Sequence, residues 1–267
     1  MDDIDNSDWV GAEELQEWDE RFKSTFATRV DVNIRKKIHS SVLQGVWDWL
    51  EEVEQLTGGK DIGVIISIGK NKKLDEYLNE LRDINGSYIR MACHQNGVIA
   101  VPTDRRWEDE VESDEKIVNE VPWSVGNTPA HHMWHEYGHF LCIGGMHRDT
   151  LSRNERGCVK INNLIEDEDY RIESGLIDED DMNLWKYSLS KCILDEKTGE
   201  PILEELYAET ACAMMTGDRI EYITEYVMYI ILKDIDAHTS IEFPEGHHLK
   251  EKKDHLYSIY DNEYALY

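Results

Sequence analysis

The sequence predicts an α+β fold, in which a small mixed β-sheet with a hairpin is followed by a mainly helical remainder. Three observations support the fold class. Short β-branched runs flanked by glycine occur before residue 102, an Asn-Gly turn separates two strand-like runs, and from Pro129 onward apolar residues recur at helical spacing. With 267 residues, the chain is long enough to bury a sizeable core.

The N-terminal half is expected to hold the sheet. Residues 1–20 form an acidic segment that docks in part through its tryptophans, and 21–267 are expected to form a single domain, because no repeat or low-complexity linker divides them. A long amphipathic helix is predicted from about 31 to 56, where apolar residues recur at steps of three and four. The β-branched run 62–68 predicts a buried strand. A helix is expected over 72–84.

The hairpin and the helical remainder follow. Two strand-like runs, 87–93 and 98–101, flank the turn Asn96-Gly97, which is a strong hairpin signal. The charged stretch 103–120 predicts a loop. Helices are then expected at about 129–143, 160–174, 180–193, 201–216, 218–233 and 247–260.

The composition excludes several classes of protein. Asp and Glu number 56 against 28 Lys and Arg, a formal net charge of −28, and such a surface repels phosphate, so we expect no nucleic-acid partner. Neither a signal-like start nor an apolar run of membrane-spanning length is found, which predicts a cytoplasmic protein without a membrane partner. The five cysteines are scattered without CxxC spacing, as is typical of a reducing compartment.

The motif with the clearest chemistry is His135-Glu136-Tyr137-Gly138-His139. Helical residues four apart lie one turn above each other, so His135 and His139 can bind one zinc ion (Zn2+). Glu136 can then act as the general base toward a water in the open coordination position. A threonine and a proline before the motif, and a glycine pair after it, place it in mid-helix. The pattern predicts a zinc-dependent hydrolase.

A catalytic zinc site needs a third protein ligand. In the acidic segment 162–173, Glu168 falls at nearly the same helical phase as the apolar isoleucines. An inward carboxylate is costly unless it is paired or bound to metal, so Glu168 is predicted as the third ligand, with Asp169 and Glu166 as alternatives.

Other polar residues are given weaker roles. The acids Glu204, Glu205 and Glu209 are expected to form the solvated face of a helix. His131 and His132 are expected at the helix surface or behind the ligands. For the oxyanion that forms in the transition state, the candidates beside the metal are Tyr170, Arg171 and Tyr207.

These motifs resemble the zincin metallopeptidases, and more narrowly the often phage-encoded metallopeptidases in which an HExxH helix is followed by a helix reading roughly N-x-x-E-D-x-R-I-E. The similarity covers 129–173, where 168–173 reads E-D-x-R-I-E. It departs from the pattern at Asn163, which stands three residues before Glu166, so two registers compete. The resemblance implies a zinc peptidase with a peptide or protein substrate, and an edge strand, here 98–101, that holds the substrate in extended form.

Two other functions are compatible with the same residues. One is a non-catalytic binding or assembly protein that keeps the zincin fold with or without metal. The other is a structural metal site, closed by a fourth protein ligand such as His131. The sequence does not indicate an oligomeric state or a cleavage preference.

Overall fold

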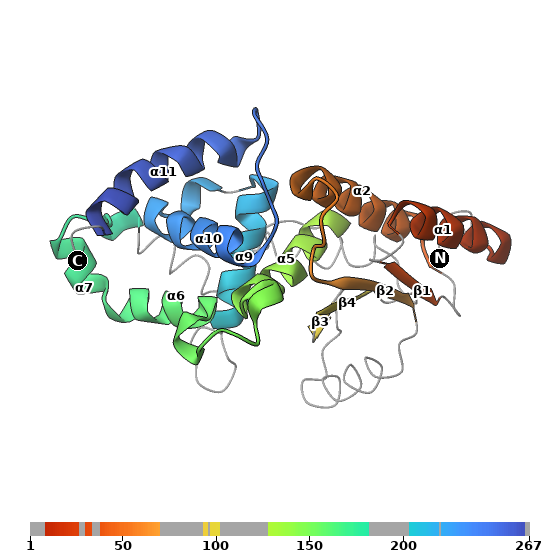
Figure 1. Cartoon of the computed structure of the whole chain (residues 1–267), viewed down its shortest axis with the longest axis horizontal. Helices are drawn as coiled ribbons and strands as arrows, with labels where there is room; N and C mark the ends of the chain where they lie inside the picture. The colour runs from red at the N-terminus through yellow and green to blue at the C-terminus, as the bar shows by residue number, and fades with distance from the viewer. Residues whose placement is uncertain are drawn as a thin grey trace, which may run out of the picture.

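The computed structural model describes residues 9–26, 30–33, 38–69, 93–95, 97–101, 128–181, 203–218 and 220–264. These residues form an α+β structure, as predicted (Figure 1). The elements are α1 (Ala12–Thr25), β1 (Val30–Asn33), α2 (Ser40–Thr57), β2 (Ile65–Gly69), β3 (Cys93–Gln95), β4 (Val98–Val101), α5 (Pro129–Cys142), α6 (Gly157–Glu166), α7 (Glu168–Glu173), α9 (Leu203–Thr216), α10 (Glu225–His238) and α11 (His248–Tyr264), with short 3-10 turns at Gly145–His147, Arg153–Glu155 and Ile220–Tyr222.

The sheet has the strand order β1-β2-β4-β3. Strands β1, β2 and β4 are parallel, whereas β3 pairs with β4 in the antiparallel sense, as the Asn-Gly turn predicts. The first strand of this hairpin is Cys93–Gln95, so residues 94 and 95 belong to the strand and not to the turn; 87–92, where most of that strand was predicted, lie outside the described residues. Gly97 in that turn has φ +77, a left-handed conformation that glycine adopts without strain. Among the described strands, β1 and β3 are therefore the two edges of the sheet and β4 is internal. The expectation that 98–101 forms the edge strand is wrong, because its hairpin partner covers that side.

The long helix predicted from residue 31 begins later. Val30–Asn33 is instead strand β1, which runs parallel to β2, and helix α2 begins at Ser40. His39 has an extended backbone and its Nδ1 accepts the Ser41 N–H, which caps the helix. Val30 and Val32 alternate as in a strand, but Val32 also fits the helical spacing of the apolar residues after it. The apolar pattern alone therefore does not separate strand β1 from helix α2.

Two further helix predictions need correction. The segment 160–174 is broken at Asp167, which separates α6 from α7. Helix α10 begins at Glu225, where the Thr224 side chain accepts the Val227 N–H, and not near residue 218. The predicted helix over 72–84, the loop 103–120 and nearly all of 180–193 lie outside the described residues.

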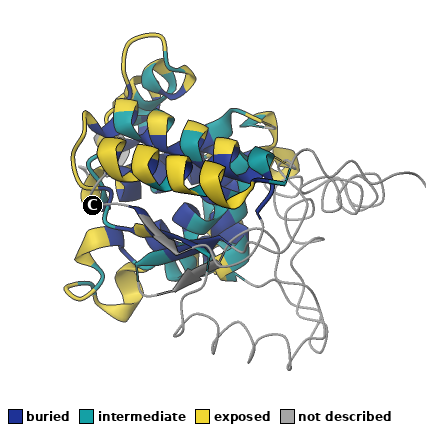
Figure 2. Ribbon diagram, turned by 90° about the vertical axis from the view of Figure 1, so that its right-hand side faces the viewer, coloured by how far each residue is buried: buried dark blue, intermediate teal, exposed yellow. Residues whose placement is uncertain are grey.

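The buried apolar residues form one cluster that runs from α1 to α11. They gather where helices and sheet face one another, while exposed residues lie on the outward sides of the helices (Figure 2). Trp18 and Phe22 of α1 belong to this cluster, and the predicted boundary at residue 20 falls inside that helix. In the part of the chain that the structure describes, no helix is both long enough and apolar enough to cross a bilayer.

Helix α5 lies at the centre of the molecule, between the sheet side and the C-terminal helices (Figure 1). On one side it packs against α2, where the Trp134 ring lies edge-on to Trp49 and Tyr137. On the other side it makes its most extensive helix contact, with α9. It also touches β3 and β4. Side chains that α5 turns toward α9 are therefore enclosed between two packed helices, where a site can form.

Candidate metal centre

Helix α5 carries the HExxH motif as the sequence predicts. Thr128 is the N-cap, its side chain accepting the His131 N–H, and Pro129 follows at the first helical position. The helix continues to Cys142, so the motif occupies its middle turns. One helical turn separates His135 from His139, and both rings lie on the same face.

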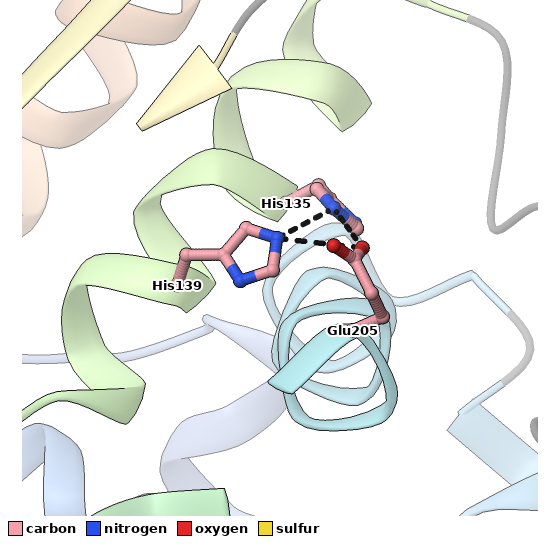
Figure 3. Close-up of side chains that lie close together, drawn as sticks. All are labelled: His135, His139 and Glu205. Carbon is pink, nitrogen blue, oxygen red and sulfur yellow. Dashed lines mark hydrogen bonds and ion pairs between the residues drawn. The ribbon is translucent and has the colours of Figure 1, made fainter. Parts of the chain in front are cut away.

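Three side chains converge there: His135 and His139 from α5, and Glu205 from α9 (Figure 3). The Nε2 atoms of the two histidines are 3.1 Å apart. Oε2 of Glu205 lies 3.1 Å from Nε2 of His135 and 3.4 Å from Nε2 of His139. Among the described residues, no other group of three or more His, Cys, Asp and Glu side chains comes as close together.

This triangle has the dimensions of one face of a zinc coordination sphere. Ligand atoms about 2.0 to 2.2 Å from a tetrahedral zinc are about 3.3 to 3.6 Å from one another. The observed edges of 3.1, 3.1 and 3.4 Å are close to that range. Two imidazoles and one carboxylate are also a common ligand set of hydrolytic zinc, with a fourth position left for a water or substrate. The residues present therefore fit a zinc ion.

A second carboxylate lies behind the first histidine. Oε1 of Glu209, one turn along α9 from Glu205, is 3.0 Å from Nδ1 of His135. The negative charge of Glu209 therefore lies on the side of the ring opposite Nε2, which faces His139 and Glu205.

The charges around the triangle favour a cation. Burial by itself lowers the pKa of His135, but the carboxylates of Glu209 and Glu205 outweigh it and hold that pKa well above the ordinary value. Burial likewise opposes ionisation of Glu205, yet hydrogen bonds from both histidines place its pKa well below the ordinary value. The site therefore stabilises positive charge, which a divalent ion supplies when it displaces protons.

The third residue of the cluster is Glu205, and not Glu168 as the sequence predicts. Glu168 opens α7 and does not belong to the cluster of ligand atoms. Its prediction assumed one continuous helix from 160 to 174, and the break at Asp167 removes the phase relation on which the inward placement depended. The alternatives also lie elsewhere, since Asp169 is exposed and Glu166 accepts a hydrogen bond from Asn162 of its own helix.

Glu205 was expected on a solvated helix face together with Glu204 and Glu209. Glu204 is exposed as expected, but Glu205 and Glu209 face α5. A signal was present in the sequence: these two acids stand one turn apart in a helix whose other residues from Leu206 to Met215 are almost all apolar and buried. Carboxylates that face inward in this way need a charged partner or a metal ion.

The three residues predicted as candidates for the oxyanion contact are held by other side chains or lie exposed on the surface. Tyr207 is fully buried and donates its hydroxyl to Asp234. Arg171 donates to the Tyr226 hydroxyl, over whose ring its guanidinium lies. Tyr170 is exposed on α7, the short helix that contacts α6.

His131 has the right spacing to extend the histidine stripe, but its ring is held by other residues. Its Nδ1 contacts the Thr128 hydroxyl and its Nε2 contacts the Asp218 carboxylate. Both ring nitrogens are therefore engaged at the N-terminal end of α5. This arrangement argues against His131 as a fourth ligand, and so against a closed structural site of the kind that the sequence left open.

The close approach of α5 and α9 depends on Gly138, the fourth residue of the motif. A Cβ at this position would lie 2.8 Å from Cα and 2.9 Å from the carbonyl oxygen of Ala208. Both atoms belong to the α9 backbone and cannot move without moving the helix. Glycine therefore allows Glu205 to reach the two histidines.

We expect Gly138→Ala to push α9 away from α5, lowering stability by about 1 to 3 kcal/mol and weakening zinc binding. Gly45→Ala is the matched control. Its new Cβ would collide with the Pro129 ring, at the contact between α2 and α5, and not with α9. Thermal unfolding and zinc titration of both variants separate the two effects. Equal zinc affinity in the two variants would show that the spacing of α5 and α9 does not matter for the site.

Compared with known proteins, the chain matches no family model, and no curated protein or solved structure is significantly similar to it.

Proposed function

We propose that the protein is a zinc-dependent hydrolase that cleaves peptide bonds. The observation that supports it most directly is the convergence of His135, His139 and Glu205 on one point, with Glu136 adjacent to the first ligand on the same helix. The spacing of the three ligand atoms suits zinc, and the acids around them favour a cation.

Each residue has a defined task in this proposal. His135, His139 and Glu205 hold the ion, and Glu209 places a negative charge beside Nδ1 of His135. A zinc ion held there would act as a Lewis acid toward a carbonyl and would lower the pKa of a bound water. Glu136 is partly buried and directly follows His135 on α5. Its carboxylate accepts the proton of the attacking water and later returns it to the leaving amine.

The fold supports a peptide as the substrate class. The edge strand β3 contacts α5, the helix that carries the motif, and it is antiparallel to the rest of the sheet. None of the other described strands pairs with the outer side of β3, and an extended peptide added there would run beside the helix that carries the ligands. The sequence resemblance to zincin peptidases favours the same class, with β3 in place of the strand first expected for this role.

The experiment measures zinc binding and cleavage together. Protein stripped with a chelator is expected to bind one equivalent of zinc by calorimetry. The zinc-loaded protein is then incubated with a denatured-protein peptide library, and new termini are identified by mass spectrometry. We expect cleavage that stops with chelator and returns with zinc.

Two outcomes would contradict the proposal in different ways. Failure to bind zinc stoichiometrically would remove the metal centre. Full zinc loading without cleavage of any library peptide would favour a non-catalytic protein that binds metal in the same fold.

A further inference from the structure

A buried polar cluster lies behind the helix that carries the third ligand. The Tyr207 hydroxyl donates to Oδ2 of Asp234 at 2.9 Å, and Nζ of Lys160 pairs with Oδ1 of the same carboxylate. Tyr207 is fully buried and Asp234 is 1% exposed. The three residues come from α9, α10 and α6, so the cluster joins three helices at one point.

The ring of Tyr207 is held as firmly as its hydroxyl. Gly157, the first residue of α6, lies under the ring, and a Cβ there would be 2.8 Å from Cδ2. The side chain is thus fixed at its tip by a hydrogen bond and along its face by the α6 backbone. Neither contact is shared with the ligands.

Helix geometry relates this cluster to the metal site. Each residue turns an α-helix by about 100°, so positions two apart point in nearly opposite directions. Tyr207 stands two residues after Glu205 and two before Glu209, and both acids contact His135. Fixing Tyr207 against α6 and α10 therefore fixes the rotation of α9 that turns the two acids toward α5.

Stability is a weak reason for keeping such a cluster. Burial takes the Asp234 carboxylate out of water, and its attraction to the partly exposed Lys160 roughly offsets that cost, so apolar residues of similar size often stabilise a protein as well. A directional effect is a better explanation, since hydrogen bonds specify an orientation that apolar packing leaves looser.

We propose that Tyr207, held by Asp234 and Lys160, is a positioning residue that sets the rotation of α9 and so presents Glu205 to the metal ion. The proposal rests on the function proposed above, because it needs a metal site at His135, His139 and Glu205. It assigns to Tyr207 a role behind the ligand and no contact with substrate.

Tyr207→Phe tests the proposal, since it removes the hydroxyl and keeps the ring over Gly157. Zinc affinity, measured by competition with a chromogenic chelator well below the unfolding temperature, is expected to fall by about 10-fold, as for other changes behind a metal ligand. Tyr229→Phe is the matched control, because Tyr229 also donates its hydroxyl to a carboxylate, that of Asp261, but joins α10 to α11. We expect its zinc affinity to match that of the unchanged protein.

A double variant separates positioning from general loosening of the fold. In a Glu205→Gln background the third ligand is already impaired, so adding Tyr207→Phe should leave zinc affinity unchanged. Asp234→Ala is a second variant that removes the acceptor without altering α9, and it should weaken zinc binding as Tyr207→Phe does.

The outcomes keep the two proposals distinct. If the unchanged protein does not bind zinc, the proposed function fails. If it binds zinc and Glu205→Gln weakens binding, but Tyr207→Phe lowers only the unfolding temperature, the positioning role is wrong and the metal site stands. Equal falls in affinity for Tyr207→Phe and Tyr229→Phe would also overturn it.

Discussion

Replacing Glu136 with glutamine is expected to reduce peptide hydrolysis by at least about 10²- to 10⁴-fold, the usual contribution of a general base, while zinc still binds. Glutamine has nearly the same shape but does not accept a proton from water. The ligands His135, His139 and Glu205 are unchanged in this variant. Initial rates on a peptide identified from the library, with zinc stoichiometry from the same preparation, measure both parts of the prediction.

Glu204→Gln is a suitable control for that experiment. Glu204 is an exposed acid beside Glu205 on α9, so the change removes one negative charge near the site without touching the ligands. Its turnover should stay within a few-fold of that of the unchanged protein. Turnover that survives Glu136→Gln would mean that another group accepts the proton, and the assigned role of Glu136 would have to be abandoned.

Glu205→Gln is expected to weaken zinc binding by more than about 100-fold, beyond the loss that changes behind a ligand usually cause. The change removes the only charged ligand of the three, and with it the carboxylate that lies within 3.4 Å of both histidines. Hydrolysis should fall in parallel at zinc concentrations that saturate the unchanged protein. Zinc titration by competition with a chelator measures the affinity.

Glu168→Gln is the matched comparison, because it makes the same chemical change at the acid that the sequence indicated. Glu168 opens α7 and lies outside the ligand cluster, so its zinc affinity should be unaltered. The reverse result, with zinc lost in Glu168→Gln and kept in Glu205→Gln, would return the third ligand to α7 and show that the contact between α5 and α9 is misassigned.

The two histidines of the site could be predicted because they lie close together in the sequence. His135 and His139 are four residues apart, and their relation follows from the pitch of a helix whose beginning is specified by Thr128 and Pro129. The β3–β4 hairpin followed in the same way from the Asn-Gly turn. In each case the residues that decide the geometry are neighbours in the chain.

The third ligand could not be predicted in this way. Glu205 lies 66 positions after His139, on a helix that reaches the motif only because Gly138 allows contact with the Ala208 backbone. An inward acid does occur beside the motif, but on α9 and not on the segment 160–174, which would have to be one helix to turn Glu168 inward. The break at Asp167 is not evident from the apolar spacing, and it changed which acid faces inward.

The sequence by itself determined the pair of histidines, the acid between them and the α+β class, because helix periodicity and turn chemistry act over a few residues. Only the tertiary structure decided that Glu205 completes the triangle, that Glu209 lies behind His135 and that β3, not β4, lies at an edge of the sheet. Those features arise where elements distant in the chain pack together. The packing depends on shape and on small residues at the contacts, which the pattern of polar and apolar residues does not encode.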